Sequence, residues 1–361
     1  MQAHFNKFST WYISQHYYVD IHPPLAKLAF AAMLWLVGFK GAQEDAPRWW
    51  VSEKEGGFIG TKDWLLLYEP EYGEPYLPLR RLSATMGVAF VLVAFLTGRA
   101  AGFGRIASVF LAWLAGCELV ILLQSRAILC DIFLYFFNMA TIGATFASAR
   151  PGLSERARVS WCLLTGLLLG CAMSVKLTAL GTVAVVGVHQ GLTLLAEAVA
   201  PGAPPAGTVV GRGVARAAAI LAPAAAVFVW LWVVHLDILI YSGQGDNFMI
   251  PEFSRMLKTK PPHSLLAAAA AAAQRDTGPP DTACPNFHNQ WADCGWAGMS
   301  EQDCTNRGCC WDPASPKAWC YRLGPQPKAA MALWPKLVET LRATWANNNG
   351  GAVMIHPHMS E

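Results

Sequence analysis

Apolar residues are concentrated in six runs in the first two thirds of the chain, and several of them approach the ~20 residues that a helix needs to cross a hydrocarbon core, although the fourth run is short. We predict membrane spans over residues 82–98, 106–123, 128–147, 161–173, 177–195 and 214–240. A seventh run, residues 25–39, is too short to span comfortably and predicts an interfacial or re-entrant helix. The fold class expected is therefore mainly α, a polytopic membrane helical bundle.

Composition and charge placement agree with a membrane protein of fixed orientation. Hydrophobic residues make up 54% of the chain and charged residues only 14%. The loops after the first, third and fifth runs carry arginines and so are predicted to face the cytosol: Arg99, Arg105, Arg150, Arg156, Arg158, Arg212 and Arg216. Residues 1–80 and everything after Tyr241 are then lumenal. No cleavable signal peptide is visible in the polar and aromatic N-terminus, and nothing indicates nucleic-acid binding.

Two predicted lumenal turns each carry one cation, Arg126 in QSRAILCD and Lys176 in MSVKL. Cations at membrane depth are costly and are usually paired or functional, so we interpret both as candidate ligands of a lipid phosphate. The alternative is that each side chain only extends to the interface, which is common for a single Arg or Lys near a helix end.

The N-terminal segment HFNKFSTWYISQHYYVDIHPPLAKL carries the most specific motif. It resembles the first lumenal loop of the protein O-mannosyltransferases, whose pattern is Asp-Glu-x-His-Phe-x-x-Phe followed by Asp-x-His-Pro-Pro-Leu-Ala-Lys. His4, Asp20 and His22 fall in register, whereas Met1 and Gln2 stand where the family has its catalytic acid pair. The resemblance implies a C-type glycosyltransferase fold.

Later motifs extend the resemblance to about residues 4–260. Glu118 with SRAILCD resembles a Glu, Ser-Arg-x-x-x-x-Asp pattern, MSVKL resembles Ser-x-Lys-Trp with Leu177 in place of Trp, and SGQGDNFMIPEF resembles a lumenal Gly-x-Gly and Pro-Glu-Phe. The implied activity is inverting transfer of mannose from dolichyl-phosphate mannose to Ser or Thr in the endoplasmic reticulum lumen, without a cofactor. The resemblance implies these substrate-binding candidates: His4, Asp20, His22, Arg126, Lys176 and Glu252. A carboxylate must also take the proton of the attacking hydroxyl. The lumenal loops offer Asp20, Asp246 and Glu252, but none of them occupies the family's base position.

Beyond the spans the composition changes twice. Residues 261–283 form an alanine- and proline-rich linker, and the next forty contain six cysteines: Cys284, Cys294, Cys304, Cys309, Cys310 and Cys320. This density indicates a disulfide-stapled module; zinc binding is the alternative, but paired Cys-x-x-Cys knuckles are lacking. The spacing of residues 284–322 resembles the trefoil (P-type) domain, which implies the pairs Cys284–Cys310, Cys294–Cys309 and Cys304–Cys320.

Residues 323–361 complete the predicted lumenal segment. They resemble the family stretch that precedes its later helices, and His356 with His358 lacks a third ligand for a metal. We expect the printed chain to represent part of an enzyme, with an acid pair upstream and helices downstream. Two other hypotheses stay open: a non-catalytic membrane protein, glycan-binding through its trefoil or accessory to a homologous active subunit, and a multi-span transporter.

The trefoil hypothesis predicts a particular disulfide. Proteolysis of the unreduced chain should release a peptide in which Cys304 is joined to Cys320, and reduction should separate it, as mass spectrometry would show. Bound zinc together with six free thiols in residues 284–322 would contradict the hypothesis.

Overall fold

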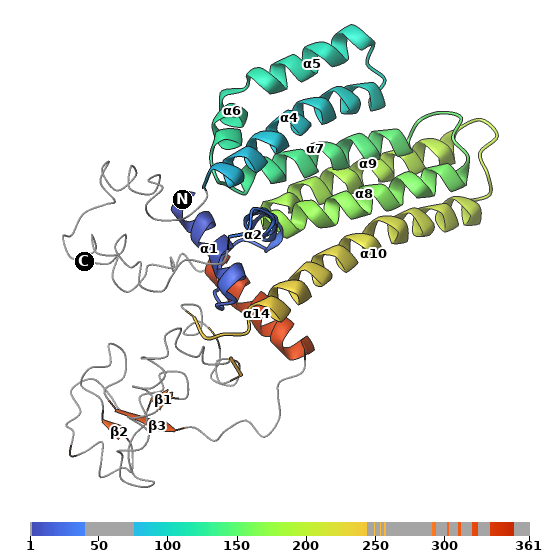
Figure 1. Cartoon of the computed structure of the whole chain (residues 1–361). Helices are drawn as coiled ribbons and strands as arrows, with labels where there is room; N and C mark the ends of the chain where they lie inside the picture. Colours follow the sequence, from blue (N-terminus) through green and yellow to red (C-terminus); the bar gives the residue numbers. More distant parts are fainter. Residues whose placement is uncertain are drawn as a thin grey trace. The chain divides into compact units, whose positions relative to one another are not determined.

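The computed structural model describes residues 2–39, 76–243 and 333–349, the short stretches 291–293, 310–311 and 320–323, and a few single residues between 249 and 302. The described residues are mainly helical, which confirms the predicted fold class (Figure 1). The chain divides into two compact units, one made of residues 1–14, 20–238 and 352–361 and the other of residues 15–19 and 239–351.

The first unit is a bundle of helices joined by short turns. Its elements are α1 (Gln2–Ser14), α2 (Leu25–Leu36), α4 (Tyr76–Ala100), α5 (Arg105–Cys117), α6 (Leu119–Arg126), α7 (Asp131–Ser148), α8 (Glu155–Val175), the 3-10 turn η3 (Leu177–Ala179), α9 (Leu180–Val199) and α10 (Ala206–Ile238). The helices overlap the six predicted runs, but the second run is broken into α5 and α6, which are bent by 58°.

Local sequence explains where these helices start and stop. At one turn, Gly102 adopts a φ of +90°, and its backbone N–H bonds the Arg99 carbonyl, which closes the end of α4. At the next turn, Ser154 caps α8 because its side-chain oxygen accepts from the backbone N–H of Ala157 at 3.3 Å. The runs therefore fold into antiparallel neighbours (Figure 1).

Small residues allow α8 and α10 to approach closely. A Cβ atom added at Gly166 or Gly170 would collide with backbone atoms of α10, at Ile220 and Ala224 respectively. Close packing of this kind matters in a membrane, where lipid tails are as apolar as the helices and the association depends on contact and hydrogen bonds.

Four described helices are long and apolar enough to cross a membrane, namely α4, α8, α10 and the continuous segment Leu177–Val199, and the bent pair α5 with α6 makes a fifth if it is one span. Helix α7 overlaps the third predicted run but is not among them, since Asp131, Asn138 and two threonines reduce its hydropathy. The multi-pass character is thus supported, and the count of six spans stays a prediction. Helix α2, with 12 residues, is too short to span.

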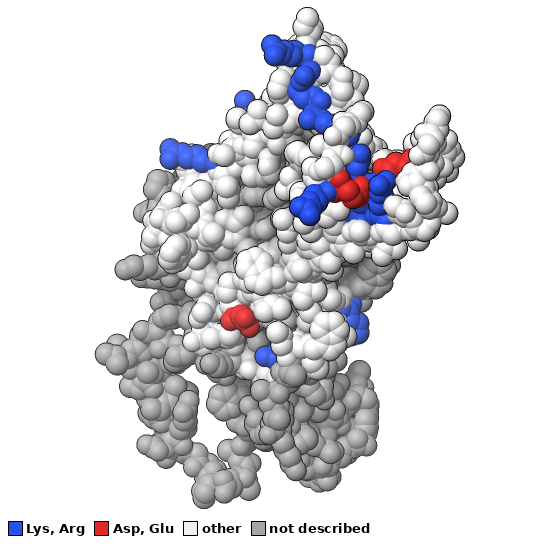
Figure 2. All heavy atoms as spheres, turned by 90° about the vertical axis from the view of Figure 1, so that its right-hand side faces the viewer, with Lys and Arg blue, Asp and Glu red and all other residues white. Residues whose placement is uncertain are grey.

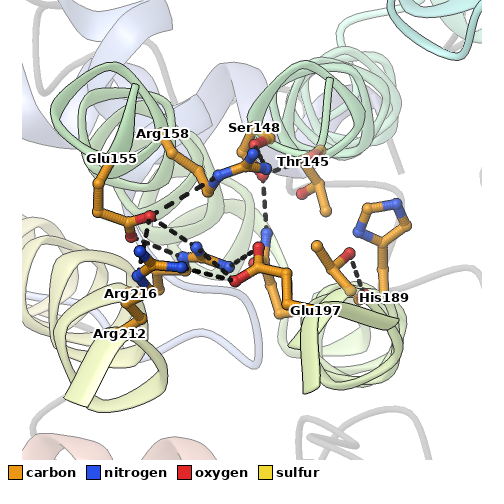
Figure 3. Close-up of polar contacts among 10 residues, drawn as sticks. Thr145, Ser148, Glu155, Arg158, His189, Glu197, Arg212 and Arg216 are labelled. Carbon is orange, nitrogen blue, oxygen red and sulfur yellow. Dashed lines mark hydrogen bonds and ion pairs between the residues drawn. The ribbon is translucent and has the colours of Figure 1, made fainter. Parts of the chain in front are cut away.

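The arginines gather at one end of this unit, where Figure 2 shows Lys and Arg with acidic residues between them. One of them is not exposed: Arg216 is 1% exposed and donates to both carboxylate oxygens of Glu155, at 2.9 and 2.8 Å, and to both of Glu197, at 2.8 and 3.1 Å (Figure 3). These bonds join α8, α9 and α10. Only Arg216 of this group is buried, because the side chains of Glu155 and Glu197 are 37% and 21% exposed.

The second unit is built on backbone pairing and a small sheet. Tyr17 donates its N–H to the Tyr241 carbonyl at 2.8 Å, and its buried ring lies 4.9 Å from that of Phe253. Strands β1 (Trp291–Asp293), β2 (Cys310–Trp311) and β3 (Cys320–Leu323) form an antiparallel sheet in the order β1-β3-β2. Helix α14 (Leu333–Asn349) follows it in the chain. The six cysteine side chains of the predicted trefoil lie outside the described residues, so their pairing stays a prediction.

The arginine-bearing turns predict one orientation in the membrane. A cysteine introduced at the exposed Gly207, at the start of α10, should react with a membrane-impermeant maleimide from the cytosolic side in a background where exposed Cys117 is replaced by Ser. The matched control is Leu77→Cys at the start of α4, which should react only after the lumenal side is opened. The reverse pattern would refute the orientation.

Candidate functional site

The end of the bundle opposite the arginines collects the N-terminal motif and both predicted lumenal turns. Helices α1 and α2, the start of α7 and the end of α8 share one apolar core, which includes Phe5, Phe30, Phe133 and Val175. The polar side chains of Asp20 and of the helix ends lie at the same end of the bundle. Helices α1 and α2, which carry most of the N-terminal motif, therefore pack against the membrane helices.

The side chain of Lys27 joins the two ends of the segment Asp20–Lys27. Lys27, in the first turn of α2, is 2% exposed, and its Nζ lies 2.6 Å from Asp20 Oδ2 and 2.6 Å from the His22 carbonyl oxygen. Pro23 and Pro24 fix the backbone direction between the loop and the helix. Asp20 and Lys27 therefore shape the loop and place His22.

A second ion pair joins two helix ends. Asp131, the first residue of α7, accepts a hydrogen bond from Lys176, which follows α8, with 3.0 Å between Oδ1 and Nζ. Both side chains are partly exposed, at 19% and 26%. Burial opposes a charge on Lys176, but the hydrogen bond and the charge of Asp131 outweigh it, so the pKa of Lys176 is raised. Lys176 therefore stays a cation in the site.

His22 lies within the influence of both ion pairs. Its ring stacks on Phe5 with 6.0 Å between centroids and an interplanar angle of 2°. Burial lowers the pKa of His22, helped by the charges of Lys27 and Lys176, although Asp20 and Asp131 act in the opposite direction. The imidazole is therefore neutral at pH 7 and can donate one hydrogen bond and accept another.

Two further groups define what the site can do. Burial beside Asp131 raises the pKa of the Cys130 thiol to about 12, so this cysteine is no nucleophile at neutral pH. The hydroxyl of Tyr12 lies 2.7 Å from Nδ1 of His235 on α10, which anchors α1 to the bundle. Among the described residues no group of three His, Cys, Asp or Glu side chains could hold a metal ion.

The structure brings Asp20, His22 and Lys176 into one neighbourhood. Arg126 ends α6 at the same end of the bundle; it is exposed and makes no ion pair or hydrogen bond with another described residue. The side chain of His4 and all of Met1, Asp246 and Glu252 lie outside the described residues, and Gln2 begins α1. The binding roles of all these residues stay predictions.

Sequence reasoning had given Lys27 and Asp131 no role of their own. Lys27 is visible in the sequence only as the last residue of the motif, and its pairing with Asp20, seven positions earlier, is seen only in the structure. Asp131 and Lys176 are 45 positions apart. Their opposite charges at facing ends of antiparallel helices were the available signal.

Known proteins match both parts of the chain. Residues 1–196 match the model of the dolichyl-phosphate-mannose-protein mannosyltransferase family, which is more than half of the 361 residues. The chain belongs to this family. Residues 284–323 match the trefoil (P-type) domain.

Family members from fungi and animals align with the same region. Dolichyl-phosphate-mannose–protein mannosyltransferase 4 of Candida albicans is 28% identical over 274 residues, covering 72% of this chain and 32% of the relative. The corresponding enzyme 3 of Saccharomyces cerevisiae is 30% identical over 261 residues, covering 71% and 32%. Protein O-mannosyl-transferase 2 of Drosophila melanogaster is 27% identical, covering 71% and 31%. The chain thus spans about a third of the length of these relatives.

A solved structure has the same fold. The S. cerevisiae protein O-mannosyltransferase Pmt1-Pmt2 complex bound to the sugar donor matches with a TM-score of 0.61 and 28% identity, over 72% of this chain and 33% of that chain. This chain therefore shares its fold with a relative whose solved structure is bound to the sugar donor.

The environment of His22 predicts a pH dependence of stability. Because its folded-state pKa is lowered, the unfolded chain binds a proton more readily, and stability present above pH ~6.5 is lost as the pH falls through the folded-state pKa. Thermal unfolding in detergent should show a smaller loss between pH 7.5 and pH 5.5 for His22→Gln than for the parent chain. An equal loss in both proteins would contradict a buried neutral His22.

Proposed function

We propose that this chain binds dolichyl-phosphate mannose at the lumenal end of its helix bundle and takes part in transferring mannose to Ser or Thr of proteins in the endoplasmic reticulum. The observation that carries the proposal is the pairing of Lys176 with Asp131 beside the Asp20–Lys27 loop, within the region that matches the mannosyltransferase family. Mannosyl transfer is proposed for this chain by analogy with relatives of whose length it spans about a third.

The charges suit a lipid phosphate. Lys176 keeps two N–H donors after its bond to Asp131, and Arg126 presents an exposed guanidinium at the same end of the bundle. Phosphate oxygens accept charge-assisted hydrogen bonds from both types of cation, and these bonds stabilise the negative charge that develops on a leaving phosphate. Neutral His22 offers a further hydrogen bond for a sugar hydroxyl or a phosphate oxygen.

Transfer also needs a carboxylate that takes the proton of the attacking hydroxyl. Asp20 and Asp131 each hold a lysine, so neither suits this role. In sequence, Met1 and Gln2 stand where the family pattern has Asp-Glu. We therefore assign donor binding to the described residues and expect little transfer from the printed chain alone.

A solved relative supports the proposed partner, and the arginine-bearing turns support the proposed compartment. The solved relative is a complex of two mannosyltransferases, so we propose a homologous subunit for this chain as well. The orientation proposed from the arginines places the trefoil in the lumen, an oxidising compartment in which its disulfides would persist. There it would lie on the same side as acceptor proteins, with a glycan as its proposed ligand.

Donor binding gives the direct test. A charge-assisted hydrogen bond contributes about 1.5–3 kcal/mol, so Lys176→Met or Arg126→Ala should each weaken binding of dolichyl-phosphate mannose by roughly tenfold to a hundredfold. Arg126→Lys should restore only part, because an ammonium lacks the planar fork. Arg105→Ala, an exposed arginine at the opposite end, is the matched control. Parent-like affinity in both site variants would refute the proposed phosphate site.

The same variants separate binding from transfer. In a chain extended to carry Asp-Glu ahead of His4 and the later helices of the family, mannosyl transfer to a Ser/Thr peptide should fall with Arg126→Ala while membrane insertion is kept. Robust transfer by the printed chain would show that one of its own carboxylates is the base.

A further inference from the structure

One face of α1 contacts polar groups of two other parts of the chain. Phe5, Phe8 and Tyr12 are three and four positions apart, so their side chains lie on the same face of the helix. In this order they contact the ring of His22, the ammonium group of Lys27 and the ring of His235. The placement of the Asp20–Lys27 segment is therefore tied to the placement of α1.

The contact between Tyr12 and His235 is the directional one. The Tyr12 hydroxyl lies 2.7 Å from Nδ1 of His235, and the two residues are only 4% and 3% exposed. The ring of Trp232, one turn earlier on α10, packs edge-on against the imidazole at 5.3 Å and restricts its rotation. Helix α10 is itself fixed, because Gly166 and Gly170 of α8 pack against its backbone. Since a hydrogen bond is lost when its atoms separate beyond about 3.5 Å, this pair allows α1 little movement relative to α10.

The contact at the other end of this face, between Phe5 and His22, sets the plane of the imidazole. The two rings are parallel, with an interplanar angle of 2° and 6.0 Å between their centroids. Within the described residues the His22 ring makes no hydrogen bond, since the bond from Lys27 goes to the backbone carbonyl of His22. Phe5 is itself buried in the apolar core. The direction in which the imidazole nitrogens point therefore depends on where α1 places Phe5.

The contact of Phe8 lies between the other two and reaches the backbone of the same segment. Nζ of Lys27 lies 5.4 Å from the centroid of the Phe8 ring, within the range of a cation–π attraction. The same Nζ bonds Oδ2 of Asp20 and the carbonyl oxygen of His22, each at 2.6 Å. A shift of α1 would therefore move both the backbone and the ring of His22.

We propose that the Tyr12–His235 hydrogen bond is a positioning contact for His22: it fixes α1 on α10, and Phe5 transmits this position to the imidazole. Tyr12, His235 and Phe5 are then positioning residues, which act on the donor through His22 rather than by touching it. That the imidazole binds the donor rests on the proposed function. The coupling between Tyr12 and the His22 ring follows from the contacts alone, so the two can be tested separately.

Chemical modification of His22 tests the coupling without a donor. Diethyl pyrocarbonate acylates neutral imidazoles, and mass spectrometry of peptides from the full chain in detergent gives the rate at each histidine. Because the stack on Phe5 shields one face of the ring, Tyr12→Phe and Phe5→Leu should each raise the rate at His22 by roughly threefold to tenfold, the shift that one neutral hydrogen bond supplies. The rate at His189, on α9, should not change. An unchanged rate at His22 in Tyr12→Phe, or an equal rise at both histidines, would overturn the proposal.

Further variants separate this contact from a general effect on α1. Thr10→Val is the matched control, because the Thr10 hydroxyl bonds the Lys7 carbonyl at 2.8 Å within the same helix, and it should leave the rate at His22 unchanged. His235→Leu removes the contact from the other side and should match Tyr12→Phe. His235→Asn should stay close to the parent chain, since its amide keeps a polar atom within reach of the Tyr12 hydroxyl. A His235→Leu variant that behaves like the parent chain would overturn the proposal.

Donor binding shows whether the positioned imidazole is used. Tyr12→Phe should weaken binding of dolichyl-phosphate mannose by roughly threefold to tenfold in the parent chain and add nothing in a His22→Ala background, because its effect passes through that ring. Equal losses in both backgrounds, or no loss in the parent chain, would overturn the positioning role. If the parent chain binds no donor while the modification rates respond as expected, the proposed function fails and the positioning contact stands.

Discussion

Polar groups inside a membrane must be satisfied by the protein itself, and this constraint organises the described structure. Three links between helices show it. Thr182 donates to Asn138 at 2.9 Å and Gln190 donates to Ser148 at 2.8 Å, both between α9 and the region of α7, while Arg216 binds two glutamates at the arginine-rich end. Apolar helix surfaces can pack in more than one register, whereas each of these hydrogen bonds forms in only one. The hydrogen bonds therefore fix how the helices pair.

The same constraint accounts for the position of the candidate site. Charges are tolerated where helices end, and Asp131 and Lys176 occupy two adjacent ends. Asp20 and His22 lie near this pair, since the charges of Lys176 and Asp131 both act on His22. Helix α1, which precedes their loop, is held by Phe5 in the apolar core and by the contact of Tyr12 with His235. A paired lysine at a helix end suits the proposed lipid phosphate, because the acyl chain can remain in the bilayer.

Hydropathy predicted the helical class and the approximate positions of the helices, because burial in lipid depends mainly on apolar length. It missed the break at Glu118, where one charge inside an apolar run carries no signal about bending. It also counted Arg216 among the loop cations, although two glutamates from other helices bury it. The motifs located the candidate site, but not its ion pairs, since Asp131 and Lys176 meet only after α7 and α8 fold together.

Charge balance explains why the site would need both Arg126 and Lys176. Asp20 with Lys27 and Asp131 with Lys176 form two ion pairs, whereas the exposed Arg126 makes no ion pair with another described residue. A phosphodiester donor carries one negative charge, which Arg126 would neutralise. On transfer, the leaving lipid phosphate gains further negative charge, and the free N–H groups of Lys176 can then bond it while Asp131 holds the lysine in place. Arg126 would thus act mainly in binding, and Lys176 mainly in departure of the phosphate.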